Sequence, residues 1–126
     1  MADEEARRLL DVAVVQEQLQ RFADAREWGQ FHSPKNLAMA LAGESGELLE
    51  VFQWLTEAQS EALDGDGRAR AAEELADIQI YLIRLADVLG ISLGEAVSAK
   101  MLANEKRYPV EVSKGKATKR SHPGDR

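Results

Sequence analysis

Four carboxylates stand in two pairs whose spacing could serve metal chemistry. Glu44 and Glu47 are three positions apart, as are Glu74 and Asp77. On an α-helix this spacing puts both members of a pair on one face. Crowded carboxylates need a raised pKa or a bound cation, and clustered oxygen ligands suit Mg²⁺ or Mn²⁺. Acidic pairs are also common on solvated helix faces, so the spacing alone leaves both interpretations open.

Four helices are predicted to position these carboxylates. Apolar residues recur every three or four positions, which is a helical spacing, over residues 3–25, 33–55, 69–89 and 92–107. Ser33-Pro34 and Ser92 are start signals, and Gly90 is a stop signal. The predicted apolar stripes of the first three helices are Leu9, Val12, Val15, Leu19 and Phe22; Leu37, Leu41, Leu48, Phe52 and Leu55; and Leu75, Ile78, Leu82, Leu85 and Leu89. If the second and third stripes pack together, the four carboxylates meet at the edge of the core.

The remaining segments connect or follow these helices. Residues 56–70 are predicted to be a connection with one short helical piece, followed by a turn at Asp64-Gly65-Asp66-Gly67. Beyond Pro109 the periodicity stops, and lysines and arginines spaced by Gly, Ser and Thr indicate a flexible basic tail. The predicted fold is all-α and four-helix bundle-like. It consists of one domain over residues 1–109, with a tail over residues 110–126.

Composition narrows the classes of function. The chain has 126 residues, no cysteine and a net charge of −6. This acidity opposes nucleic-acid binding, and it requires a cation between the protein and any free nucleotide. No apolar run approaches the roughly 20 residues of a membrane span, and Met1 to Arg8 lacks a signal-peptide core. We therefore expect a cytoplasmic protein that binds neither membranes nor nucleic acid.

Several ordered motifs carry a resemblance to a known family. Gly43-Glu44-Ser45-Gly46-Glu47 and Glu74-Leu75-Ala76-Asp77 resemble the E-E-x-x-E and E-x-x-D motifs of the all-α nucleoside triphosphate pyrophosphatases, the MazG-like proteins. Gly43 replaces the first Glu of that pattern. The chain is most similar to the compact dCTP pyrophosphatases, through blocks over Arg26 to Leu37, Gly43 to Trp54, Glu73 to Leu82 and Lys100 to Pro109.

The resemblance implies an enzyme that hydrolyses a nucleoside triphosphate to a monophosphate and pyrophosphate. Glu44, Glu47, Glu74 and Asp77 match the ligands of Mg²⁺, with Mn²⁺ as an alternative, and Glu47 is our candidate for the catalytic general base. The implied substrates are pyrimidine deoxynucleotides such as dCTP or 5-modified dCTP, in house-cleaning of the nucleotide pool. The implied assembly is a homotetramer, a dimer of dimers, and apolar residues outside the predicted stripes agree with it: Met1, Val14, Val51 and Ile80.

The resemblance also implies the residues that bind substrate. Trp28, Trp54 and Tyr81 match aromatic positions that contact the base, although either Trp could instead be a core residue. Lys100 and Asn104 match positions that approach the substrate, and His32 either contacts it or caps its loop. The dCTP-type enzymes carry a substrate-contacting His in the first helix, where this chain has Leu19.

Two alternatives to this function remain open at this stage. One is a dUTPase-like or phosphoribosyl-ATP pyrophosphohydrolase-like enzyme of the same fold. The other is a non-catalytic helical module that oligomerises and regulates. Retention of all four acids argues against the second.

Overall fold

The computed structural model describes residues 10–118, and these residues form helices without any strand. In chain order the elements are α2 (Val12–Ala25), the 3₁₀ helix η1 (Trp28–Phe31), α3 (Pro34–Phe52), α4 (Glu57–Glu61), α5 (Gly65–Leu89), α6 (Leu93–Arg107) and α7 (Val110–Ser113). The all-α prediction is confirmed. The structure divides into two compact units, residues 1–91 and residues 92–126, and each is described by itself.

Side-chain caps begin two of the helices at the predicted places. The hydroxyl of Ser33 accepts a hydrogen bond from the backbone N–H of Asn36, so that α3 begins with Pro34 in its first turn. Ser92 caps α6 in the same way. At the end of α5, Gly90 has a φ of 67°, a left-handed conformation that glycine adopts without steric cost.

Two predicted helix starts are wrong, and capping explains both. The first helix was expected from about Asp3, but α2 begins at Val12, because the Asp11 carboxylate accepts the N–H of Ala13 and caps it; residues 3–9 lie outside the described part of the chain. The third helix was expected from Ala69, but α5 begins at Gly65. The carboxylate of Asp64 accepts the N–H of Gly67, so the Asp-Gly stretch caps the helix instead of forming a turn.

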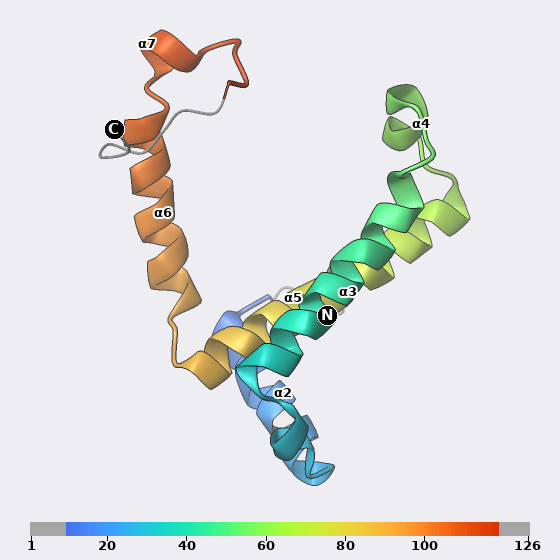
Figure 1. Ribbon diagram of the computed structural model, residues 1–126, viewed down its shortest axis with the longest axis vertical. Coiled ribbons are helices and arrows are strands. Elements are labelled where there is room, and N and C mark those ends of the chain that lie inside the picture. The colour runs from blue at the N-terminus through green and yellow to red at the C-terminus, as the bar shows by residue number, and fades with distance from the viewer. Residues whose placement is uncertain (1–9, 119–126) are drawn as a thin grey trace, which may run out of the picture. The chain divides into compact units, whose positions relative to one another are not determined.

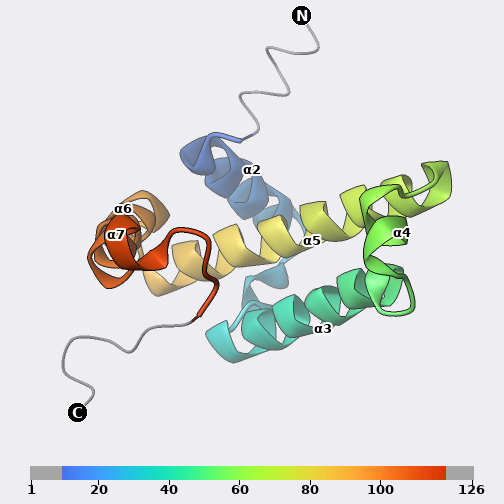
Figure 2. The ribbon, with the colours of Figure 1, turned by 90° about the horizontal axis from the view of Figure 1, so that it is seen from above.

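Helix α5 is the central element of the first unit. α3 runs antiparallel along one side of α5, and α2 packs against another side (Figures 1 and 2). The short helix α4 lies in the connection between α3 and α5, where a short helical piece was predicted. Because α3 and α5 lie side by side, the carboxylate pair of each helix can face the other.

The buried apolar residues of the described chain are few: Ala23, Leu37, Val51, Ala71, Ile83 and Ala86. The predicted stripe of α5 is partly wrong, because Leu75 is 56% and Leu89 50% exposed while Ile83 is buried. Val51, predicted to lie outside the core, belongs to it. Periodicity identifies a helix, but the neighbours of the helix decide which face is covered.

The second unit contains α6 and α7. α6 carries Lys100 and Asn104 and ends at Arg107, as predicted. A short helix, Val110–Ser113, follows Pro109, in the segment where no helix was expected. Among the described residues, no helix is long and apolar enough to cross a membrane.

Candidate metal and substrate site

The two carboxylate pairs meet between α3 and α5. One carboxylate oxygen from each of Glu44, Glu74 and Asp77 lies within 4.8 Å of the others. Glu44 and Glu74 are half-buried, and Oε2 of each is shielded from solvent without a hydrogen-bond donor among the described residues. Shielded oxygens without a donor are costly unless a cation or a proton reaches them. This donor set fits a divalent cation that prefers oxygen ligands.

Electrostatics within this cluster shift two pKa values. Hydrogen bonding with Glu44, partial desolvation and the negative charge of Glu47 raise the pKa of Glu74 to about 7. A hydrogen bond from Glu74 lowers the pKa of Glu44, but desolvation and the charges of Glu47 and Asp77 outweigh it and leave that pKa raised. Glu47 is exposed and is not one of the three clustered ligands, yet it is close enough to act on both neighbours.

The raised pKa predicts that Glu74→Gln stabilises the metal-free protein at pH 8. In the folded state Glu74 keeps its proton up to about pH 7, whereas in the unfolded chain it ionises near 4.5. Stability therefore falls as the pH rises through this window, and Gln removes that loss. In thermal melts with EDTA, the variant should melt above the wild type at pH 8, and the gap should narrow toward pH 5. Glu73→Gln, at an exposed neighbour, is the control, and equal melting temperatures at pH 8 would contradict the prediction.

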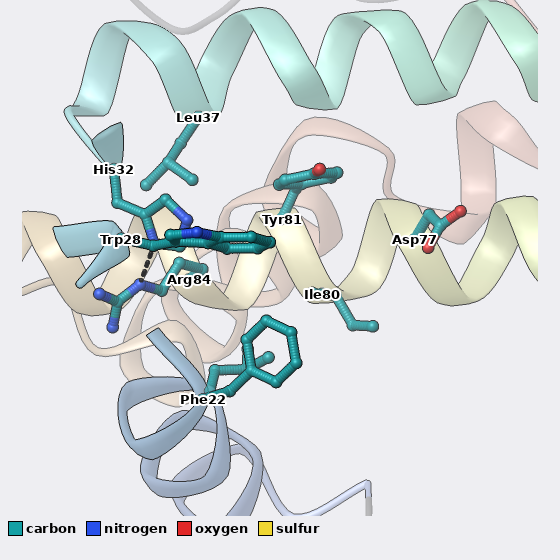
Figure 3. A pocket seen from close by; sticks show the side chains of 9 residues that line it. Phe22, Trp28, His32, Leu37, Asp77, Ile80, Tyr81 and Arg84 are labelled. Atoms are coloured by element: carbon teal, nitrogen blue, oxygen red, sulfur yellow. Dashed lines mark hydrogen bonds between the residues drawn. The ribbon is translucent and has the colours of Figure 1, made fainter. Parts of the chain in front are cut away.

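A cavity of about 130 Å³ adjoins the carboxylate cluster. Its lining residues come from α2, from the segment around η1, from α3 and from α5: Leu19, Phe22, Trp28, His32, Leu37, Asp77, Ile80, Tyr81 and Arg84. The Phe22 ring meets the Trp28 ring edge to face, with centroids 5.5 Å apart. Figure 3 shows Trp28, His32 and Tyr81 around the space between α3 and α5, with Asp77 further along α5.

The backbone between α2 and α3 places Trp28 and His32 in this cavity. Glu27 has a φ of 54°, a left-handed conformation that is uncommon for a residue other than glycine and that turns the chain into η1. The Asn36 side chain donates a hydrogen bond to the carbonyl of Phe31, at 3.1 Å, and so ties η1 to the start of α3. The end of the loop that carries both rings is thus fixed to the start of α3.

One face of α5 joins the two parts of the site. Glu74, Asp77, Tyr81 and Arg84 follow at intervals of three or four residues, and such residues lie on one face of a helix. The face is anionic at Glu74 and Asp77 and aromatic at Tyr81. Across it, α3 supplies Glu44 near the anionic end. This arrangement suits a ligand with a cation-bound phosphate group at one end and a flat ring at the other.

The structure brings together some of the predicted substrate residues and not others. Trp28, His32 and Tyr81 share the cavity, as does Leu19. Trp54 is 86% exposed within the single chain and does not line the cavity. Lys100 and Asn104 lie on α6, in the second unit, so their roles stay predictions.

Sequence reasoning missed four residues that line the cavity. One is Ile80, which was assigned to a surface that a second copy covers. Phe22 was assigned to a core stripe but is 45% exposed and packs on Trp28. Leu37 was assigned to the core as well; it is buried and also lines the cavity. Arg84 was not predicted to belong to the site, although it stands seven residues after Asp77 on the same helix. That spacing of two turns was the one available signal.

Comparison with known proteins agrees with this geometry. Residues 40–122 match the profile of the MazG-like family, and the chain therefore belongs to this family of all-α proteins. It is similar to dCTP pyrophosphatase 1 of Rattus norvegicus, with 48% identity over 100 residues, and to dCTP pyrophosphatase 1 of Homo sapiens, with 45% identity over 100 residues. Each alignment covers 78% of this chain and 59% of the relative, so the chain spans about three-fifths of the length of these proteins.

A solved structure shows the same fold. The crystal structure of a pyrophosphatase from Archaeoglobus fulgidus superposes with a TM-score of 0.66 at 41% sequence identity. The match covers 74% of this chain and 87% of that protein.

Proposed function

We propose that this protein is a Mg²⁺-dependent nucleoside triphosphate pyrophosphohydrolase, which converts a nucleoside triphosphate and water to a monophosphate and pyrophosphate. The observation that carries the proposal is the continuous site between α3 and α5, in which shielded carboxylates at Glu44 and Glu74 adjoin an aromatic cavity at Trp28 and Tyr81. The names of its relatives support dCTP, a nucleotide with a pyrimidine base, as the substrate. As implied by the family resemblance, 5-modified dCTP and a role in house-cleaning of the nucleotide pool are part of the same proposal.

Each part of the site has a role in this proposal. Glu44, Glu47, Glu74 and Asp77 would hold Mg²⁺, which when bound neutralises phosphate charge and lowers the pKa of water. Glu47 is the proposed general base: it is exposed and lies outside the group of three clustered ligands. It would accept the proton of the water whose oxygen attacks the α-phosphorus, while the bond to the pyrophosphate oxygen breaks.

The other proposed residues hold the two ends of the substrate. Trp28 and Tyr81 would pack against the base, because an aromatic ring offers any base a stacking surface. His32 would contact the edge of the base from the same cavity. Lys100 and Asn104 of α6 are proposed to approach the phosphates or the sugar. The ammonium group of Lys100 suits a phosphate, and the amide of Asn104 suits a hydrogen bond to either group.

Release of pyrophosphate from dCTP tests this function. With Mg²⁺ the protein should release one pyrophosphate per dCMP formed, and excess EDTA should stop the reaction. Mn²⁺ should restore it at least in part, since both ions prefer oxygen ligands. Release of orthophosphate without pyrophosphate would contradict the proposed reaction. No release at any Mg²⁺ concentration would contradict the proposal and favour a regulatory module.

Exposed apolar surface supports an oligomer, and on the family resemblance we propose a homotetramer, a dimer of dimers. Large apolar side chains stay exposed within the single chain, among them Leu49 at 58%, Trp54 at 86% and Met101 at 61%. A largely apolar groove between α2 and α5, lined by Val15, Leu75 and Ile83 among others, is a further surface that a second copy would cover.

Light scattering checks the assembly. At micromolar concentration the measured mass should be about four times the chain mass of 13.9 kDa, because such surface is stable in water only when covered. Trp54 fluorescence, followed in a Trp28→Phe background, should shift to the blue on assembly. A mass of one chain would contradict the proposal.

A further inference from the structure

The wall of the cavity contains a buried cation, the guanidinium of Arg84. Arg84 is 5% exposed and is the buried charged residue of the described chain. Its Nε donates a hydrogen bond to Nδ1 of His32 at 3.0 Å, and its Nη1 donates one to Oε1 of Gln20 at 2.7 Å. Asp87, 3.8 Å from Nη1, is the acidic partner. Arg84 thus ties α2 and the η1 loop to α5, and Figure 3 shows its hydrogen bond to His32.

These contacts determine which nitrogen of His32 carries the proton. A guanidinium has donors only, so the nitrogen that faces it must be an acceptor. Nδ1 is therefore unprotonated, and in the neutral ring the proton is on Nε2. Burial and the charge of Arg84 both lower the pKa of His32, which keeps the ring neutral at pH 7.

The protonated nitrogen remains available to a ligand. No hydrogen bond joins Nε2 of His32 to another residue of the described chain. The imidazole lines the cavity beside Trp28, with ring centroids 6.3 Å apart. A ring seated against Trp28 would meet mostly apolar side chains, so a single N–H donor there would select for an acceptor on the ring edge.

We propose that Arg84 is a positioning residue that holds His32 as an Nε2–H donor, and that this N–H recognises an acceptor on the edge of the pyrimidine base. This rests on the proposed function, because that function puts a pyrimidine in the cavity. Stability alone gives little reason for Arg84, since apolar residues of similar volume often replace buried ionic groups without loss. Its role is to set the hydrogen-bonding pattern of His32.

Histidine NMR tests the tautomer without any turnover. The chain has two histidines, so a His122→Gln background leaves only His32 in long-range ¹H–¹⁵N spectra. There Nε2 should show the shift of a protonated nitrogen and Nδ1 that of an unprotonated one. Arg84→Met, which keeps the volume and removes the donors, should move both shifts toward a mixture of tautomers. Arg68→Met, at an exposed position of the same helix, should change neither shift.

Binding of a substrate analogue tests whether the protonated nitrogen of His32 contacts the base. The probe is the non-hydrolysable α,β-imido analogue of dCTP with Mg²⁺, and its binding should shift the Nε2 signal of His32. In kinetics, Arg84→Met should raise KM for dCTP by about 3- to 10-fold, the usual size of one hydrogen bond, and leave kcat nearly unchanged. If Arg84→Met does not fold, Arg84→Leu, which also removes the Nε donor to His32, should change the His32 shifts in the same direction.

The outcomes distinguish a failure of this inference from a failure of the proposed hydrolase function. An unchanged His32 tautomer in a folded Arg84→Met or Arg84→Leu variant would overturn the inference even in an active enzyme. A wild type that binds the analogue through His32 but releases no pyrophosphate would contradict the hydrolase assignment and support the inference. An analogue that binds without moving the Nε2 signal would overturn the base contact.

Discussion

Glu47→Gln and Asp77→Asn are each expected to lower kcat by about 100- to 10,000-fold, the usual contribution of a positioned general base or acid. Asp77 belongs to the clustered group with Glu44 and Glu74, whereas Glu47 stands just outside it. Each change keeps the size of the side chain and removes a charge from a crowded acidic cluster. We therefore expect both variants to remain folded, with unchanged circular dichroism.

The two variants should differ in their response to Mg²⁺. Binding to the folded state alone raises the melting temperature by mass action. Asp77→Asn should lose most of this gain, because it removes a proposed ligand. Glu47→Gln should keep more of it, because Glu47 lies outside the group of three clustered ligands and its main proposed role is that of the base. Glu50→Gln on α3 and Glu73→Gln on α5 are matched controls at exposed positions, and full pyrophosphate release by either active-site variant would contradict the assignment.

Trp28→Ala is expected to raise KM for every nucleotide by about 5- to 150-fold, because base–aromatic stacking contributes about 1–3 kcal/mol and every base has a stacking face. Trp28 is central to the cavity, where Phe22 and His32 pack against its edges. Phe31→Ala is the matched control, since Phe31 belongs to the same 3₁₀ helix, is 58% exposed and does not line the cavity. An unchanged KM in Trp28→Ala would remove Trp28 from the site.

The wild type should rank pyrimidine deoxynucleoside triphosphates above purines in kcat/KM. A cavity of about 130 Å³ bounded by Trp28, Tyr81 and Phe22 has limited room for a second ring. Discrimination between dCTP and dTTP should be only about 10- to 100-fold, because shape selection supplies about 1–3 kcal/mol and Leu19 offers no hydrogen bond where dCTP-type enzymes carry a His. Steady-state kinetics on the eight common triphosphates check this, and a purine at the top of the ranking would refute it.

Trp54→Ala tests whether a second copy completes the site. Trp54 is 86% exposed within the single chain, so an effect on KM for every nucleotide requires that assembly bring it to a base. Wild-type kinetics in this variant would show that Trp54 has no part in binding.

The local features of this protein were predictable from its sequence because they depend on neighbours in the chain. The cap at Ser33, the left-handed Gly90 and the pairing of Glu74 with Asp77 each involve residues within four positions. Helical geometry decides such relations wherever the helix lies. The motifs of the acidic pairs also indicated the MazG-like family, which the family profile confirms.

The helix boundaries show where local reasoning becomes ambiguous. Asp64-Gly65-Asp66-Gly67 has the composition of a turn, yet Asp64 caps a helix that continues through both glycines. The same short polar side chain serves either purpose, so composition does not separate a turn from a cap. Gly43 and Gly46 also lie inside a helix, α3. A side chain at either position would meet open space within the chain, so no close neighbour in the chain requires glycine there.

Tertiary structure alone decided which residues share the cavity. Arg84 is 52 positions from its hydrogen-bond partner His32 and 64 positions from its partner Gln20. Periodicity carries no information about partners so far apart in the sequence. The burial of Val51 and Ile83, and the exposure of Leu75, likewise follow from how α2 and α3 pack against α5. A sequence pattern gives the angle of a side chain around its own helix, whereas burial depends on the surface that another helix places against it.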